Sequence, residues 1–196
     1  MDAGSGDSPE ISTTMSAPDL AARIAQRTII GLGNEFLSDD GLGIRVVRDL
    51  RKRLPADTAT FEELSIGGLE LLDHITGYDE CVIVDAIATG THPPGTLYRR
   101  VQKDPESTVP MRSSHQIDLM QVVRLAGLLG AAVPRRIVLY GIEAGDITTF
   151  HEGCTTEVTR AVPYLVDAIC MDLQGPGLPS GDSPGTWQVI HHTLSD

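Results

Sequence analysis

Basic residues are scarce in this chain of 196 residues, which carries 15 Lys and Arg against 27 Asp and Glu and a net charge of −12. A surface this negative repels phosphate groups, which excludes nucleic acids and acidic membranes as partners. No apolar run approaches the ~20 residues that cross a bilayer. The N-terminus is acidic and rich in Ser, unlike a signal peptide. We therefore expect a cytoplasmic protein with no membrane and no nucleic-acid partner.

Cysteine and the common catalytic motifs are also rare or missing. The three cysteines, Cys81, Cys154 and Cys170, are odd in number and form no CxxC motif, so we expect free thiols in a reducing compartment. The sequence contains no HExxH, GxSxG or Walker motif. His151 stands three residues before Cys154, but this proximity alone is weak evidence for a thiol nucleophile.

The chain divides into three parts by composition. Residues 1–22 are polar and acidic and read as a flexible leader. Residues 23–173 alternate between apolar strand-like runs and amphipathic helical segments. Residues 174–196 begin with a Gly/Pro-rich stretch that holds neither helix nor strand, and the short end that follows could dock or stay loose. We expect one folded domain between two irregular ends.

The alternation within the middle part predicts the fold class. The expected strands are 28–32, 59–64, 81–87, 95–101 (an edge strand) and 136–142. The expected helices are 40–54, 68–75, 115–130 and 155–173, the last with a kink or broken turn at Pro163. This order predicts a three-layer α/β fold, with a mostly parallel, twisted sheet of about five strands flanked by helices. Ligands of such folds bind beyond the carboxyl ends of the strands.

The segment GLGNEFLSDDGLG (residues 31–43) follows the first strand and leads into a helix. This layout is typical of a phosphate-binding turn, but Phe36 stands where the GxGxxG fingerprint needs its third glycine. Asp39 and Asp40 also occupy the helix start at which an anion would bind. Glu62, near the end of the second strand, could serve a ribose, so the nucleotide interpretation is disfavoured but open.

The other interpretations concern these aspartates and two residues farther along the chain. Asp39 is explained as an N-cap of the helix, whereas Asp40 is not needed for that role. Asp85 closes a buried strand that we expect beside the first strand, which would bring it near Asp40. His115 opens a helix, as a cap or surface residue would. If the imidazole instead joins the two carboxylates, the three form a divalent metal site with open positions.

Taken together, these residues resemble the nickel–iron hydrogenase maturation endopeptidases. The resemblance rests on an opening GxGNxxxxD(D/E)GxG motif, a strand ending in Asp-Ala, an (S/P)HQ segment before a helix, a PGT turn and a strand running into Gly-Ile-Glu. Here these motifs are residues 31–43, Asp85-Ala86, Ser114-His115-Gln116, Pro94-Gly95-Thr96 and Gly141-Ile142-Glu143. Their order is consistent over roughly residues 27–173.

The resemblance implies an endopeptidase that removes the C-terminal extension of a hydrogenase large-subunit precursor after nickel insertion. Nickel would arrive with the precursor as the recognition mark, and Asp40, Asp85 and His115 would contact it. Two mechanisms stay open. Nickel bridged by Asp40, Asp85 and His115 would polarise the scissile carbonyl or activate water, or nickel would only dock and orient the substrate while Asp40 or Asp85 acts as the general base on water.

The same resemblance implies supporting residues and leaves an alternative. Asn34 and Gly41 would shape the loop, and Asp39 would cap the helix or support the metal-contacting residues from behind. We expect a monomer whose partner is the precursor. The alternative is a chaperone that binds metal or precursor through the same residues without cleaving it.

Overall fold

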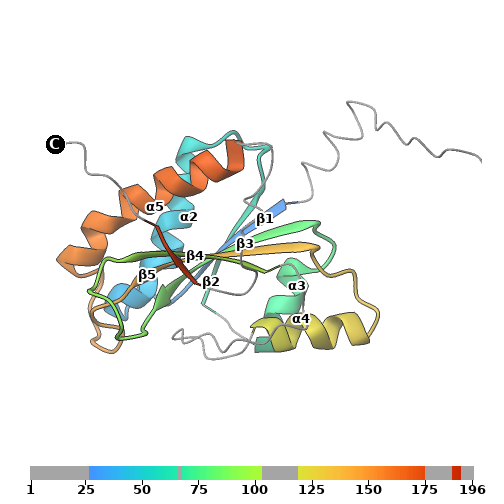
Figure 1. The fold of residues 1–196 in the computed structure, drawn as a ribbon, viewed down its shortest axis with the longest axis horizontal. Coiled ribbons are helices and arrows are strands. Elements are labelled where there is room, and N and C mark those ends of the chain that lie inside the picture. Colours follow the sequence, from blue (N-terminus) through green and yellow to red (C-terminus); the bar gives the residue numbers. More distant parts are fainter. Residues whose placement is uncertain (1–26, 66–67, 103–118, 175–186, 191–196) are drawn as a thin grey trace, which may run out of the picture.

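The computed structural model of the chain describes residues 27–65, 68–102, 119–174 and 187–190. They form a six-stranded sheet in the order β2-β1-β3-β5-β4-β6 with helices on both faces (Figure 1). The strands are β1 (Arg27–Leu32), β2 (Thr60–Leu64), β3 (Glu80–Ile87), β4 (Leu97–Gln102), β5 (Arg136–Glu143) and β6 (Gln188–Val189). The helices are η1 (Ser38–Gly41), α2 (Leu42–Arg53), η2 (Gly68–Leu71), α3 (Leu72–Ile75), α4 (Leu119–Leu128) and α5 (Thr156–Gln174).

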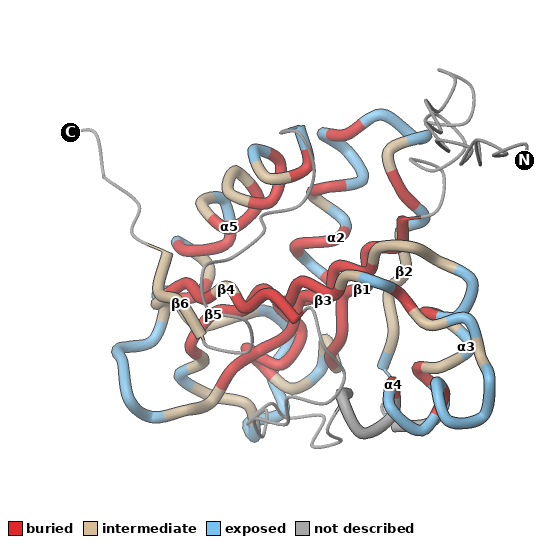
Figure 2. Tube along the Cα trace, turned by 45° about the vertical axis from the view of Figure 1, so that its right-hand side comes forward, coloured by how far each residue is buried: buried red, intermediate tan, exposed pale blue. Residues whose placement is uncertain are grey.

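Two hydrophobic cores confirm the predicted three-layer α/β fold. One core lies between the sheet and the pair α2 and α5, and the other lies beneath α3 and α4 (Figures 1 and 2). Successive strand residues alternate between these cores, as the pleat requires. In β3, Val82 and Val84 face α2 and α5, whereas Cys81 and Ile83 belong to the other core. Because both faces are covered, the central strands are largely apolar.

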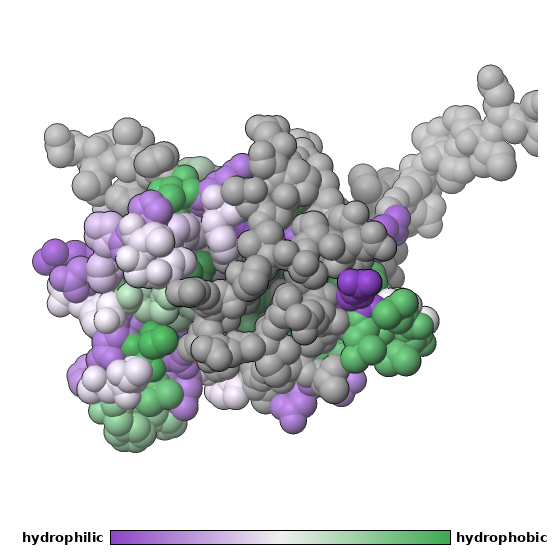
Figure 3. All heavy atoms as spheres, turned by 60° about the horizontal axis from the view of Figure 1, so that its bottom comes forward, coloured by the Kyte–Doolittle hydropathy of each residue, from purple (hydrophilic) through white to green (hydrophobic). Residues whose placement is uncertain are grey.

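The amphipathic helices pack with the faces that their spacing predicts. The residues predicted to face inward are all buried. In α2 and the residue that follows it they are Leu42, Val46, Val47, Leu50 and Leu54, and in α5 they are Val158, Val162, Val166, Ile169 and Leu173. The predicted start of the helix 115–130 lies outside the described residues. The C-terminal end of α4 leaves Leu128 and Leu129 exposed, and hydrophobic surface is visible there in Figure 3.

Two details of the predicted architecture are wrong. β4 was expected at the sheet edge, but it lies between β5 and β6 and pairs antiparallel with both. The two-residue β6 makes the sheet six-stranded, and a strand this short leaves no periodic signal in a Gly/Pro-rich tail. Of the two outcomes predicted at Pro163, the broken turn does not occur, since α5 stays helical through this exposed position; the kink stays a prediction.

Residues 1–26 and most of the tail lie outside the described parts, so the division of the chain into leader, domain and tail stays a prediction. Within the described ranges, no helix combines the length and apolar character needed to cross a membrane.

The helix α2 approaches the sheet unusually closely through Gly43. A Cβ atom added to Gly43 would lie 2.3 Å from the Leu32 carbonyl oxygen and 2.4 Å from that of Val84. These oxygens belong to β1 and β3, so the missing side chain lets the first turn of α2 rest on the backbone of both strands. This contact fixes the residues just before α2 over the carboxyl ends of these strands.

We predict that Gly43→Ala lowers the free energy of unfolding by about 3 kcal/mol, because overpacking against rigid backbone costs about 1–3 kcal/mol or more. Gly127→Ala is the matched control. Gly127 lies on an exposed position of α4 with no atom within 4 Å of an added Cβ, so the change should be neutral or stabilise by up to ~1 kcal/mol. Urea denaturation measures both, and equal effects would contradict the proposed role of Gly43.

Candidate active site

Two buried carboxylates lie at the carboxyl ends of adjacent parallel strands. Asp85 is 3% exposed and lies near the end of β3, where its Oδ1 accepts a hydrogen bond of 2.8 Å from the Ala86 N–H. Asp40 is 2% exposed and lies in η1, which follows β1 and packs against β3. β1 and β3 pair in parallel, with Gly31 opposite Val84. The expected neighbourhood of the first and third strands is therefore confirmed, and the two aspartates share one edge of the sheet.

The loop before Asp40 is built around its carboxylate. The Asn34 N–H donates a hydrogen bond of 2.7 Å to Asp40 Oδ2, and the Asn34 side-chain oxygen accepts one of 3.0 Å from the Phe36 N–H. A Cβ atom on Gly41 would lie 2.8 Å from the Glu35 Cα, so glycine permits this tight turn. Because the Asn34 amide is already bound to a carboxylate, it is not available to a phosphate, which disfavours the nucleotide interpretation.

His115, the third predicted metal contact, lies outside the described residues. Among the residues that the structure does describe, no group of three or more His, Cys, Asp or Glu side chains is arranged to hold a metal ion. Asp40 and Asp85 each offer carboxylate oxygens, which are ligands of divalent metal ions. The set Asp40, Asp85 and His115 stays a prediction.

Asp39 has a structural role that differs from the predicted N-cap. Neither η1 nor α2 has a side-chain cap, and the Asp39 carboxylate instead reaches the loop between β5 and α5. It accepts hydrogen bonds from the N–H groups of Gly145 (2.8 Å), Asp146 (3.0 Å) and Thr155 (2.6 Å), and one of 3.0 Å from the Thr155 hydroxyl. Asp39 is 0% exposed. The N-cap prediction is wrong because the donors that satisfy this carboxylate come from a distant part of the chain.

Backbone hydrogen bonds join the same two loops. The Ser38 N–H donates to the His151 carbonyl at 2.9 Å, and the Asp39 N–H donates to the Asp146 carbonyl at 2.9 Å. Ser38 has a φ of 53°, a left-handed conformation that is unfavourable for a residue other than glycine. This turn of the backbone immediately precedes Asp39. The surrounding hydrogen bonds therefore hold a strained, buried residue directly before the two aspartates.

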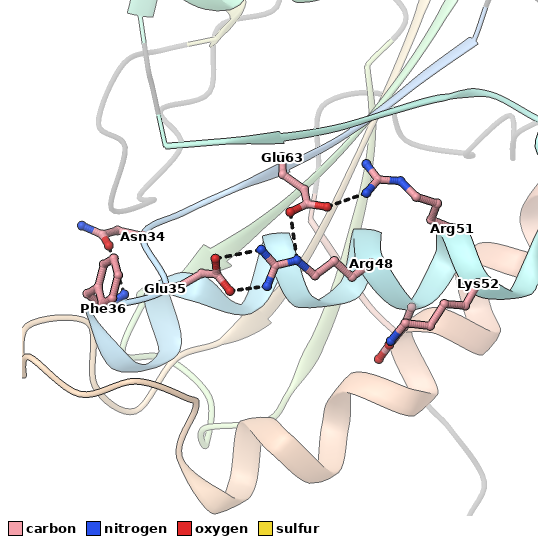
Figure 4. A network of polar contacts seen from close by, with 8 residues as sticks. Asn34, Glu35, Phe36, Arg48, Arg51, Lys52 and Glu63 are labelled. Atoms are coloured by element: carbon pink, nitrogen blue, oxygen red, sulfur yellow. Dashed lines mark hydrogen bonds and ion pairs between the residues drawn. The ribbon is translucent and has the colours of Figure 1, made fainter.

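A chain of ion pairs ties the loop after β1 to α2 and β2. Arg48 of α2 binds both carboxylate oxygens of Glu35, and its Nε lies 2.9 Å from Glu63 of β2 (Figure 4). Glu63 also accepts a hydrogen bond of 2.7 Å from Arg51. Such exposed pairs contribute only ~0–1 kcal/mol each. Their effect is to orient Glu35 and hence the loop that carries Asn34.

Glu143 is a buried carboxylate to which the sequence analysis gave no separate role. It ends β5, is 1% exposed, and accepts hydrogen bonds from the Thr89 hydroxyl (2.8 Å), the Gly90 N–H (2.7 Å) and the Tyr98 hydroxyl (2.8 Å). The bonds to Thr89 and Gly90 hold the connection between β3 and β4 beside the carboxyl end of β3. The sequence pattern that pointed to Asp85, an acidic residue at the end of a buried strand, applies to Glu143 as well.

The cysteines are free, as predicted, and Cys154 shows no sign of activation. Burial, with the negative charge of Asp39, raises the pKa of the Cys154 thiol. A thiol nucleophile needs the opposite shift. His151 Nδ1 lies 3.1 Å from the Gly153 carbonyl oxygen rather than near the thiol. The geometry therefore favours the carboxylates, and not Cys154, as the reactive groups.

Comparison with known proteins identifies the family. Residues 44–172 match the family model HycI, described as hydrogenase maturation protease. The chain belongs to the hydrogenase maturation protease family. This membership confirms the predicted resemblance and the assignment as a peptidase rather than a non-catalytic chaperone. The matched range includes Asp85 and the position of His115 but begins after Asp40.

Relatives of this family cover most of the chain. The hydrogenase 2 maturation protease of Escherichia coli is 28% identical over 153 residues, covering 76% of this chain and 92% of its own length. The hydrogenase expression/formation protein HoxM of Azotobacter vinelandii is 31% identical, with coverages of 75% and 68%. The solved hydrogenase maturating endopeptidase HybD of E. coli superposes with a TM-score of 0.62 at 25% identity, over 81% of this chain and 99% of that one.

We predict that Asp39→Ala lowers the free energy of unfolding by at least ~3 kcal/mol, because it leaves four donors without their buried acceptor. Urea denaturation measures the change. Asp49→Ala serves as the control, since Asp49 makes only an exposed pair with Lys52 and its loss should cost no more than ~0.5 kcal/mol. If Asp39→Ala lowered the free energy of unfolding no more than Asp49→Ala does, the hydrogen bonds of Asp39 would not support the fold.

The Glu143 network gives a prediction on titration. Burial first, and then the hydrogen bond to Glu143, raises the pKa of Tyr98 above its ordinary value of 10. We expect Glu143→Gln to lower the pKa of Tyr98 partway toward 10, since burial remains. NMR titration of ring-labelled tyrosine measures the shift, and Glu152→Gln on an exposed loop should leave it unchanged. An unaltered Tyr98 in Glu143→Gln would refute the assigned contact.

Proposed function

We propose that this protease removes the C-terminal extension of a nickel–iron hydrogenase large-subunit precursor, and that it does so after nickel has entered the precursor. The observation that carries the proposal is the pair of buried carboxylates, Asp40 and Asp85, at one sheet edge of a chain in this family. Two carboxylates at one edge of the sheet give that edge a negative charge, which attracts a cation presented by the substrate. Their oxygens are also suitable ligands for a divalent metal ion.

Nickel is part of the substrate in this proposal. Asp40, Asp85 and His115 contact the ion held by the precursor and thereby align the peptide bond that follows the metal-binding part. Only a loaded precursor supplies the cation that the two carboxylates attract, so an empty one binds weakly. The selectivity thus follows from the charge of the site.

The chemical step is hydrolysis of one amide bond. A carboxylate of Asp40 or Asp85 accepts a proton from water while the water oxygen attacks the carbonyl carbon. The C–N bond then breaks, and the departing amine takes up the proton. The products are the new carboxylate end of the large subunit and the released extension.

The protein acts as a monomer in the cytoplasm under this proposal. The free state of Cys81, Cys154 and Cys170 supports a reducing compartment, and the precursor is the one macromolecular partner required.

The test compares cleavage of nickel-loaded and nickel-free precursor by the purified protein. We expect the wild type to clip only the loaded form, and Asp40→Asn and Asp85→Asn to lose at least ~100-fold in rate, as removal of a general base commonly costs 10²–10⁴-fold. His115→Ala should weaken binding of the loaded precursor.

Asp57→Asn provides the matched control, because Asp57 is exposed on the loop between α2 and β2, and it should retain full activity. If the wild type cleaves neither form of a precursor that cell extract can process, the proposed function falls. Equal cleavage of both forms would retain the protease but remove nickel as the recognition mark.

A further inference from the structure

Two exposed phenylalanines stack on each other beside the candidate active site. Phe36 and Phe150 are 56% and 81% exposed, their ring centroids lie 5.9 Å apart, and the ring planes differ by 10°. They come from the loops that follow β1 and β5. Single exposed apolar side chains are ordinary on a protein surface, but here two aromatic rings from two separate loops stack on each other and form one apolar surface.

The backbone beneath this aromatic pair is fixed. The His151 N–H donates to the Phe36 carbonyl at 3.0 Å, and the Ser38 N–H donates to the His151 carbonyl at 2.9 Å. These bonds form a bridge between Leu37 and His151, directly under the rings. The buried Asp39 carboxylate joins the same loops from the inside. The two rings are thus held ready for a partner, which lowers the entropy lost on binding.

The aromatic pair is also continuous with the site through Asn34. Its backbone N–H donates to Asp40, whereas its side-chain oxygen accepts from the Phe36 N–H. Asn34 therefore links the backbone of Phe36 directly to the Asp40 carboxylate. By contrast, the exposed Leu128 and Leu129 lie next to each other where α4 ends, on a single segment of the chain.

We propose that Phe36 and Phe150 form a docking platform for an apolar side chain of the hydrogenase precursor, next to the bond that is cleaved. This inference rests on the proposed function, because the precursor is the occupant. An aliphatic side chain suits the platform, since it can cover the ring faces without placing a charge on them. Aromatic anchors of this kind commonly contribute most of the binding energy at protein interfaces.

The experiment measures KM and kcat for nickel-loaded precursor with Phe36→Ala, Phe150→Ala and the double variant. We expect each single change to raise KM about tenfold, which corresponds to ~1.4 kcal/mol, with kcat changed less than about twofold. Phe36→Tyr keeps the ring and should restore most of the affinity. Leu128→Ala and Met171→Ala remove exposed apolar side chains elsewhere and should leave KM unchanged.

Three further readouts make the result decisive. Thermal unfolding midpoints should match the wild type, because both rings are exposed. Direct binding of the precursor separates docking from hydrolysis. A wild type that binds the precursor without cleaving it refutes the proposed function, but weaker binding by the alanine variants would still support the platform.

Two binding results overturn the platform: alanine variants that bind as tightly as the wild type, and a wild type that binds no precursor. Sedimentation that shows a wild-type dimer lost in Phe150→Ala would assign the pair to a second copy of the chain and overturn it as well.

Discussion

The buried carboxylate of Asp39 is the constraint on which the site depends. A charge removed from water must find donors, and this one finds four, on residues 106 to 116 positions away along the chain. The loop after β1 and the loop after β5 therefore have to meet in one arrangement. That arrangement sets the turn holding Asp40, the left-handed Ser38 and the position of the two exposed phenylalanines. The Asp40 turn, Ser38 and the two phenylalanines thus take one defined arrangement, because the Asp39 carboxylate needs hydrogen-bond donors from both loops.

The neighbouring aspartates show how environment separates residues of the same type. Asp39 is saturated by donors from the fold and has a structural role. Asp40 accepts a hydrogen bond from the Asn34 N–H and lies on the turn that packs against β3, the strand that carries Asp85 near its carboxyl end. The hydrogen bonds of the first carboxylate hold two loops of the protein together, and the second carboxylate is the one that we propose for contact with the substrate. The close contact of Gly43 with the backbone of β1 and β3 fixes the position of this turn over the sheet, and thereby the position of Asp39 and Asp40.

The layers and the central strands could be predicted because buried strands such as 81–87 and 136–142 leave continuous apolar runs, and helix faces leave a regular spacing. The shared edge of Asp40 and Asp85 followed from strand order. The partners of Asp39 could not be predicted. The N-cap rule considers only neighbouring residues, whereas the donors that bind Asp39 come close to it only in the folded chain. Glu143 was quoted within a motif but given no role, since its donors Thr89, Gly90 and Tyr98 come from a different connection. The short β6 leaves no pattern at all.

That short strand has a consequence for the behaviour of the whole sheet. Without β6, the outer side of β4 would present unpaired N–H and C=O groups, the kind of edge that invites pairing with another chain. Gln188 and Val189 pair with Arg99 and Tyr98, and Trp187 packs its ring edge-to-face with Tyr98. Arg99 also reaches both Asp172 of α5 and the Gln188 side chain. A few residues of the tail therefore cover the edge of β4 and disfavour edge-to-edge aggregation. This role is separate from the proposed catalysis.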